Sequence, residues 1–210
     1  MTRIVIVDYG AGNVESVRNA IYMAGFDPVV SSEPEDVLAA DRLVLPGVGA
    51  AGWALERLRG CGLYDAIEEA VVEKGRPMLG ICLGMQLLAG TLHEFGCHQG
   101  FGWIDGSVIP LKKMIADGAT VPHMGWNHVE PCENAEGMVA EGLAMGGFFY
   151  FAHSYILRPY DETVVVATVD YGIPLVAAVR WQTVFAVQFH PEKSQDDGQR
   201  LLSAFFGWKP

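Results

Sequence analysis

A cysteine between two glycines is the part of this sequence with the clearest capacity for covalent chemistry. Residues 80–84 read Gly-Ile-Cys-Leu-Gly, and Cys82 lies where a short apolar run predicts a buried strand turning sharply into a helix. A nucleophile on such a turn has strained backbone and needs neighbours without side chains. The dipole of the following helix would favour the thiolate. The competing interpretation is a small buried hydrophobe, the usual fate of a free cysteine.

His190 and Glu192 are the candidate base and the group that orients it. Both follow the apolar run 184–189, where the tip of a strand would present side chains to a cleft. Two positions apart on an extended segment, they would face the same way. A cysteine nucleophile needs a base to move its proton and a third group to hold that base. The alternative, a histidine and an acid on a solvated loop, is weakened by the cysteine motif.

Residues 47–52, Gly-Val-Gly-Ala-Ala-Gly, allow two interpretations. They satisfy the GxGxxG pattern of a dinucleotide-binding loop. However, they follow a later strand than the first, and Asp65 and Glu68 fall in a helical pattern rather than at the strand end that ribose recognition requires. The segment could instead supply backbone N–H donors for the oxyanion of acyl transfer, with Leu83 as the other donor. We favour the second interpretation.

The elements that must position these residues alternate between strand and helix in the first half of the chain. Strands are predicted at 3–8, 28–31, 41–45 and 77–81, and helices at 13–24, 53–59, 64–74 and 83–89. Continuous apolar strands that alternate with helices predict a parallel sheet covered on both faces, and therefore an α/β fold.

The second half is rich in strand-like runs separated by turn signals. These lie at 107–111, 126–130, 148–155, 163–169, 175–180 and 183–189, and a closing helix is predicted at 199–206. A hairpin at Trp181-Gln182 would join the last two strands. This half is therefore predicted to be antiparallel or mixed. Without a repeat or linker, residues 1–210 are interpreted as a single domain.

The composition restricts the class of partner. The 210 residues carry a formal net charge of −11, and half of them are apolar. Binding to nucleic acid draws its affinity from Lys and Arg at phosphates, so we expect small molecules or a protein instead.

Cysteine usage and hydropathy point to the cytoplasm. The four cysteines lack C-x-x-C spacing, which suggests free thiols in a reducing compartment and no zinc site. Residues 4–7 are far too short for a signal-peptide core, and no run approaches the ~18 apolar residues of a membrane span. We expect a cytoplasmic protein that contacts no membrane.

Two motifs together resemble the class I glutamine amidotransferase family, whose triad is Cys-His-Glu. They are Gly-Ile-Cys82-Leu-Gly-Met-Gln86 and Phe-His190-Pro-Glu192. Three further segments resemble one branch of that family, the glutaminase subunits of imidazole glycerol phosphate synthases: 45–49 (Leu-Pro-Gly-Val-Gly), 123–127 (His-Met-Gly-Trp-Asn) and 149–155 (Phe-Tyr-Phe-Ala-His-Ser-Tyr). The resemblance implies a flavodoxin-like fold and release of ammonia from L-glutamine.

The resemblance also implies roles for residues around the triad. The second oxyanion donor would come from the strand at Val48 and Gly49, where a peptide plane could rotate so that the hole forms on demand. Gln86, one helical turn after Cys82, would help to hold glutamine. Ser154 and Tyr155 match the segment that contacts the α-amino and carboxylate ends of the substrate.

By the same resemblance, the ammonia would pass to a β/α-barrel cyclase subunit, which forms imidazole glycerol phosphate and aminoimidazole carboxamide ribonucleotide. The matching partner interface would include His123, Trp126 and Asn127, with Asn13 and Lys193 on the same face. No cofactor or metal is implied.

Three other functions stay open at this point. The chain could supply ammonia to another synthase, such as a pyridoxal phosphate synthase or a sugar-modifying enzyme. It could be a catalytically silent binding module on the same fold. It could also be a cysteine or thioester hydrolase that uses the same strand-to-helix turn.

Overall fold

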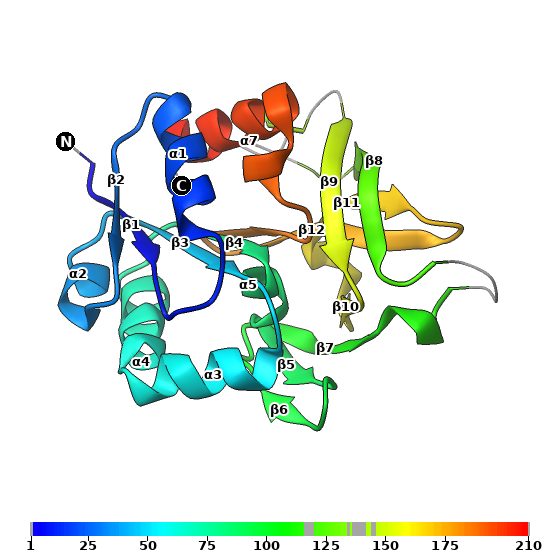
Figure 1. Ribbon diagram of the computed structural model, residues 1–210, viewed down its shortest axis with the longest axis horizontal. Helices are drawn as coiled ribbons and strands as arrows, with labels where there is room; N and C mark the ends of the chain where they lie inside the picture. Colours follow the sequence, from blue (N-terminus) through cyan, green and yellow to red (C-terminus); the bar gives the residue numbers. More distant parts are fainter. Residues whose placement is uncertain (1, 116–119, 134, 136–141, 144–145, 210) are drawn as a thin grey trace.

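A large mixed sheet runs through the protein and carries helices on both faces (Figure 1). The computed structural model describes residues 2–115, 120–133, 135, 142–143 and 146–209. Within this part of the chain, the large sheet has nine strands in the order β2-β1-β3-β4-β13-β12-β11-β8-β9, and a second sheet has four.

The first five strands in this order run parallel to one another, as predicted for β1 to β4, whereas β13 belongs to the half of the chain that was predicted to be antiparallel or mixed. They are β2 (Pro28–Ser31), β1 (Ile4–Val7), β3 (Arg42–Gly47), β4 (Met78–Cys82) and β13 (Val184–Val187). Both faces of these strands are apolar. In β1, Val5 and Val7 join one hydrophobic core while Ile4 and Ile6 join the other. Successive side chains point to opposite faces, so an unbroken apolar run feeds both cores.

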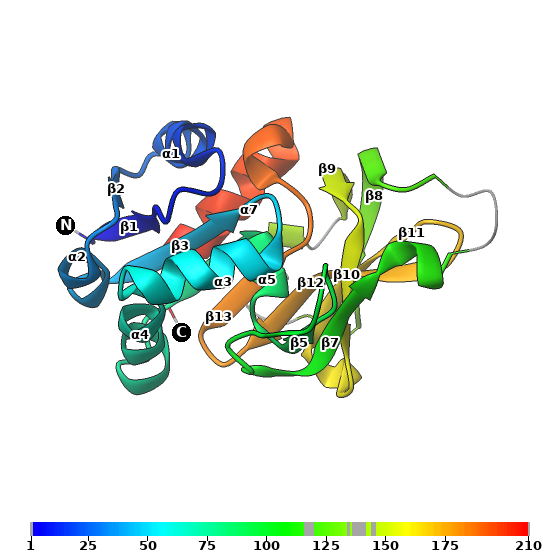
Figure 2. The same ribbon diagram turned by 60° about the horizontal axis from the view of Figure 1, so that its bottom comes forward.

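The helices divide between the two faces of the sheet (Figures 1 and 2). Helices α1 (Val14–Met23) and α7 (Gln195–Gly207) pack together on one face. On the other lie α3 (Ala51–Gly60) and α4 (Leu63–Glu68), which continues into a π-helical turn at Glu69–Glu73. The short α2 (Pro34–Leu38), which the sequence analysis did not predict, packs against α4.

The remaining strands of the large sheet are antiparallel, which confirms the prediction that the second half of the chain is antiparallel or mixed. They are β12 (Pro174–Trp181), β11 (Val165–Asp170), β8 (His123–Pro131) and β9 (Gly147–His153). The predicted hairpin joins β12 to β13, and Trp181 pairs with Val184, so Gln182 and Thr183 form its loop. Gln182 has φ +50°.

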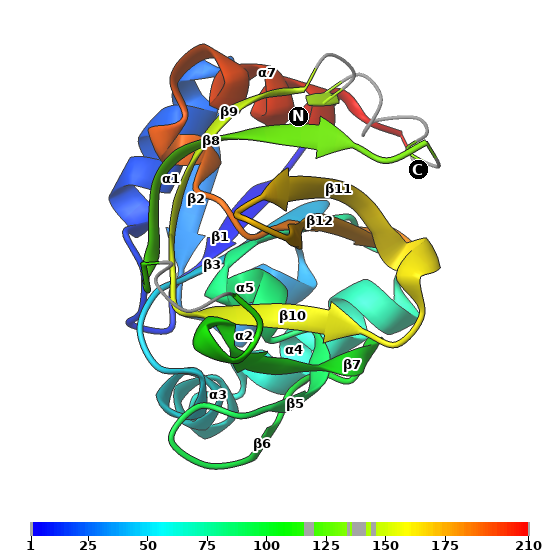
Figure 3. The same ribbon diagram turned by 90° about the vertical axis from the view of Figure 1, so that its right-hand side faces the viewer.

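A second sheet lies against the antiparallel half, and Figure 3 shows its strands β10 and β7 beside β12 and β11. Its strands are β5 (Ala89–Leu92), β6 (His98–Gln99), β7 (Ile104–Pro110) and β10 (Tyr155–Pro159). The predicted single strand over 148–155 is therefore wrong at its end. The chain leaves one sheet after His153 and enters the other at Tyr155, which places Ser154 at the crossing.

The helix after Cys82 is shorter than the sequence predicts. Helix α5 covers Leu83–Gln86, and the chain then turns into β5 instead of continuing to residue 89. A short apolar run such as 87–89 fits a buried strand as well as a helix, and its pattern does not decide. Few peptide dipoles align in one turn, so the dipole expected at Cys82 is small.

No helix in the described part of the chain is long and apolar enough to cross a membrane.

The turn between β4 and α5 depends on close backbone packing. A Cβ atom added to Gly84 would lie 1.9 Å from the carbonyl oxygen of Leu45 in β3. A Cβ at Gly80 would lie 3.0 Å from the Cβ of Ala186. The two glycines that flank Cys82 are therefore required by the neighbouring strands, as predicted.

Gly84→Ala should destabilise the protein strongly because its methyl group has no space beside Leu45. We expect a loss of about 3 kcal/mol or more in the free energy of unfolding, measured by urea denaturation. The matched control is Gly60→Ala at the exposed end of α3, where a Cβ meets nothing within 4 Å; its effect should stay within about 1 kcal/mol. Equal stability of the two variants would contradict this packing account.

Candidate active site

Cys82 ends β4 with φ +54° and ψ −105°, a backbone conformation that non-glycine residues rarely adopt. Its side chain lies at the carboxyl end of the parallel strands, beside Gly47 of β3. The residue is only 6% exposed. The strained turn expected for a nucleophile is therefore present.

His190 and Glu192 follow β13, the other parallel neighbour of β4. The His190 Nδ1 atom lies 2.8 Å from Glu192 Oε1, and both side chains are almost fully buried. They face each other because Pro191–Lys193 forms a 3-10 turn, not the extended segment that was predicted. The His190 backbone N–H donates to the carbonyl of Tyr150 in β9 at 2.8 Å, which fixes the turn to the antiparallel half of the sheet.

The charge of His190 is set by its two neighbours. Burial lowers the pKa of His190, but hydrogen bonds to Cys82 and Glu192 and their negative charges outweigh it and raise the pKa to about 10. Since Glu192 occupies Nδ1, the contact with Cys82 is made by Nε2. The three side chains therefore form one chain, in which the imidazole holds a proton between a sulfur and a carboxylate.

A cavity of about 570 Å³ opens beside Cys82. Its lining includes all of the predicted oxyanion and substrate residues, which come from three separate parts of the chain: Val48, Gly49, Leu83, Gln86, Ser154 and Tyr155. Glu94, Phe95, Met124 and His153 complete much of its rim and wall. The cavity brings together residues that the sequence separates by more than a hundred positions.

Gln86 is buried and its amide nitrogen is fully engaged. Nε2 donates to the Tyr155 carbonyl and to Gln188 Oε1, both at 3.0 Å. Gln188 Nε2 in turn lies 3.6 Å from the Cys82 sulfur. With both amide protons used, Gln86 offers the cavity only its oxygen, which is an acceptor. Gln188 was not singled out from the sequence, although it begins the segment that contains His190.

The segment 47–52 does not have the surroundings of a nucleotide-binding loop. At its end, the Ala51 N–H at the start of α3 donates to Glu94 Oε2 at 2.7 Å. An acidic side chain thus occupies the helix N-terminus where a phosphate would bind. Glu94 is a residue that sequence reasoning missed, because a single acid in a loop carries no local signal.

The two glycines of the proposed oxyanion strand differ in their surroundings. A Cβ at Gly47 would lie 2.4 Å from the hydroxyl of Tyr9, which donates to the Pro46 carbonyl at 3.1 Å. At Gly49, φ is +90° and a Cβ would meet nothing within 4 Å. The strand is therefore tightly packed up to Gly47 and open at Val48 and Gly49, both of which are exposed.

The residues predicted for a partner interface separate into exposed and buried ones. Asn13, Trp126 and Lys193 are exposed, and Asn127 is half-buried. Lys193 and Trp126 both contact the ring of Tyr150. His123 is fully buried, so its side chain lies inside the protein and not on a contact surface.

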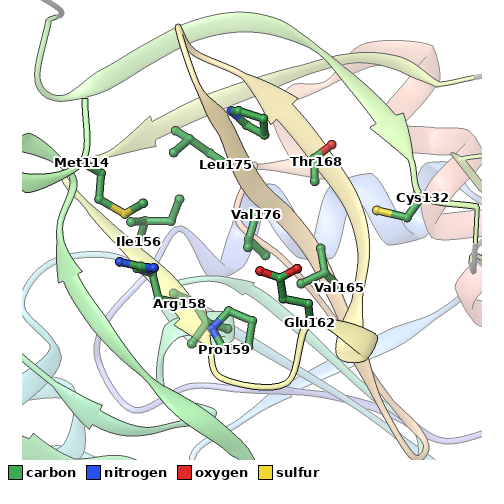
Figure 4. A pocket seen from close by; sticks show the side chains of 12 residues that line it. Met114, Cys132, Ile156, Arg158, Pro159, Glu162, Val165, Thr168, Leu175 and Val176 are labelled. Carbon is green, nitrogen blue, oxygen red and sulfur yellow. The ribbon is translucent and has the colours of Figure 1, made fainter. Parts of the chain in front are cut away.

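A second cavity, of about 460 Å³, lies between β10, β11 and β12 (Figure 4). Its walls combine apolar side chains such as Ile156 and Leu175 with the charged groups of Arg158 and Glu162. None of the predicted site residues lines it.

Three comparisons with known proteins agree with this geometry. The chain matches the family model for glutamine amidotransferase class-I over residues 5–207. It is 46% identical over 211 residues to a protein of Zymomonas mobilis subsp. mobilis named imidazole glycerol phosphate synthase subunit HisH, covering 99% of this chain and 96% of that protein. A protein of the same name from Aquifex aeolicus is 46% identical over 204 residues, covering 97% and 95%. The solved structure of PurLQS from Thermotoga maritima superposes with a TM-score of 0.73 at 19% identity and 98% coverage of each chain, which confirms the predicted fold class.

Cys82→Ala should lower the pKa of His190 from about 10, because it removes a hydrogen bond and a negative charge that favour the imidazolium. The pKa of His190 is ~6.5 in an unfolded chain and about 10 in the folded protein. This difference stabilises the folded protein fully below pH ~6.5, and the stabilisation is lost as the pH rises through about 10. Ring chemical shifts of His190, followed by NMR against pH, would measure the change. The control is Cys97→Ala, since Cys97 is exposed. An unchanged pKa in Cys82→Ala would contradict the assignment.

Proposed function

This chain belongs to the class I glutamine amidotransferase family, and we propose that it is the glutaminase subunit of an imidazole glycerol phosphate synthase in histidine biosynthesis. The observation that carries this proposal is the chain of contacts from Glu192 through His190 to Cys82 at the edge of a cavity. Identity of 46% with proteins of that name, over nearly the whole of each chain, supports the choice within the family. We treat residues 1–210 as one functional unit.

In the first step, the Cys82 thiolate attacks the side-chain carbonyl carbon of glutamine. Because His190 already holds a proton beside the sulfur, no proton has to leave the nucleophile during the attack. His190 then gives its proton from Nε2 to the departing nitrogen, and ammonia leaves with a thioester on Cys82. Glu192 keeps Nδ1 engaged, which holds the ring in the orientation that this transfer needs.

In the second step, water cleaves the thioester. His190 is now neutral at Nε2 and accepts a proton from the water, whose oxygen attacks the thioester carbonyl. Glutamate and the thiolate of Cys82 are released, and His190 is again protonated. Each cycle consumes one glutamine and one water and produces one glutamate and one ammonia.

The negative charge of each tetrahedral intermediate requires backbone donors. Leu83, directly after Cys82, supplies one N–H, and Val48 supplies the other. The open surroundings of Val48 and Gly49 allow their peptide planes to rotate, whereas the packing of Gly47 against Tyr9 holds the preceding part of the strand. We therefore assign the formation of the complete oxyanion hole to a rotation at Val48 and Gly49.

Groups on the cavity wall match the polar ends of glutamine. Gln86 presents an oxygen to hydrogen-bond donors of the substrate, and Ser154 and Tyr155 line the same cavity and would contact its α-substituents. Glu94 supplies a negative charge in the same cavity, which suits the α-ammonium group.

A docked partner would receive the ammonia before solvent protonates it. The partner we propose is the cyclase subunit of the synthase, a β/α-barrel that forms imidazole glycerol phosphate and aminoimidazole carboxamide ribonucleotide. The exposed apolar residues Val48 and Met124 line the cavity, Trp126 is exposed two residues further along β8, and Asn13 and Lys193 are exposed as well. These residues form the surface we assign to the partner, and we propose a cytoplasmic complex.

The coupled activity can be tested by measuring glutamate release by the purified chain, with and without the cyclase subunit and its ribonucleotide substrate. We expect release to rise when both are added and to disappear in Cys82→Ser, because the hydroxyl is a far weaker nucleophile. Cys97→Ser should keep the wild-type rate. Glutamate release that is indifferent to both additions would contradict a partner-controlled glutaminase, and release by Cys82→Ser would contradict the nucleophile.

Glu94→Gln should raise the KM for glutamine by a factor of about 10 to 100, because it removes a charged partner of the α-ammonium group. The amide keeps an oxygen for the Ala51 N–H, so the start of α3 should be unaffected. Steady-state kinetics would separate KM from kcat, with Glu73→Gln as a control at an exposed position. An unchanged KM would remove Glu94 from the substrate site.

A further inference from the structure

Two buried histidines outside the triad lie opposite each other on paired strands. His123 in β8 pairs with His153 at the end of β9, and their side chains are joined by a contact of 3.0 Å from His123 Nδ1 to His153 Nε2. The two residues are 0% and 5% exposed. His123 is stacked between Phe151 and Tyr171, at ring distances of 4.5 and 4.0 Å, which fixes its plane.

The direction of the hydrogen bonds follows from the group at one end. His153 Nδ1 lies 2.9 Å from the carbonyl oxygen of Tyr155, which can only accept, so Nδ1 must carry a proton. Burial lowers the pKa of His153 to about 3, so the ring is neutral and its Nε2 is an acceptor. The donor at the contact between the two rings is therefore His123 Nδ1.

The protonation of His123 follows from its burial in the same way. Burial also lowers the pKa of His123, so this ring is neutral and its Nε2 is an acceptor. Nε2 lies 2.9 Å from Oδ1 of Asn127, which is an acceptor, so a neutral His123 with its proton on Nδ1 requires the Asn127 amide to be turned over so that its NH2 group faces Nε2. With the amide in that orientation, each group donates to the next, from Asn127 through His123 and His153 to the carbonyl of Tyr155.

The Tyr155 carbonyl is also where this chain meets the catalytic cavity. It accepts a second hydrogen bond from Gln86 Nε2, whose other proton goes to Gln188, the residue beside the Cys82 sulfur. His153 itself lines the cavity. The Tyr155 carbonyl thus accepts from two donors, Gln86 Nε2 and His153 Nδ1, and both of these residues line the substrate cavity.

We propose that His153, held in its Nδ1–H tautomer by His123, is a positioning residue that fixes the Tyr155 peptide and thereby the wall that binds glutamine. This proposal rests on the proposed function, because only the proposed function assigns Ser154 and Tyr155 to substrate binding. His153 takes no part in proton transfer. Its loss weakens the binding of glutamine and leaves the triad in place.

Two substitutions of His153 separate this role from general packing. In His153→Asn the amide nitrogen can replace Nδ1, whereas the longer side chain of His153→Gln places its amide near the position of Nε2. We expect His153→Gln to raise the KM for glutamine by about tenfold, the loss of one hydrogen bond, with kcat within about twofold. His153→Asn should restore most of the affinity. The control is His93→Asn, because His93 is an exposed histidine directly after β5.

A second measurement does not depend on activity or on how the variants fold. The ring nitrogen chemical shifts of the wild-type protein distinguish the two neutral tautomers from the imidazolium. We expect His153 to be protonated at Nδ1 and not at Nε2 near neutral pH. A proton on Nε2, equal KM values for the Asn and Gln variants, or a fall in kcat at unchanged KM would each overturn the proposal. Absence of glutamate release by the wild type with its cyclase partner would instead contradict the proposed function, and the nitrogen shifts would still test the tautomer.

Discussion

The close approach of α5 to β3 is the constraint on which the site depends. Gly84 packs against the carbonyl of Leu45, and the backbone at Cys82 is forced into a positive φ. This single turn positions three functional groups. It presents the sulfur at the end of β4, puts the Leu83 N–H beside it, and places Gln86 one turn further on the same short helix. The strain is sustained because the parallel strands on both sides are fully buried.

Two histidines near this turn show how the surroundings of a histidine decide whether its ring is protonated. His190 and His153 are both buried, which disfavours the charged ring in each. His190 faces the carboxylate of Glu192 and the sulfur of Cys82, and its pKa is raised to about 10. His153 faces a carbonyl and another histidine, and its pKa falls to about 3. One ring is therefore prepared to move a proton and the other to hold a peptide in place.

Sequence reasoning located the features that have a local pattern. The apolar strands β1 to β4, the glycines around Cys82 and the spacing of His190 and Glu192 are all visible in short windows. Contacts between distant segments leave no such pattern. Glu94 at the start of α3, Gln188 beside the sulfur and the pairing of His123 with His153 depend on which strands become neighbours. The crossing at Ser154 was missed for the same reason, since 148–155 is one continuous strand-like run.

In the proposed mechanism, Cys82 is the residue that attacks glutamine. Treatment of the protein and its cyclase partner with a chloroketone analogue of glutamine, followed by peptide mass spectrometry, tests this directly. We expect a single adduct on Cys82, protection by excess glutamine, and unmodified Cys61, Cys97 and Cys132. An adduct on another cysteine, or labelling of Cys82 that glutamine does not slow, would contradict it.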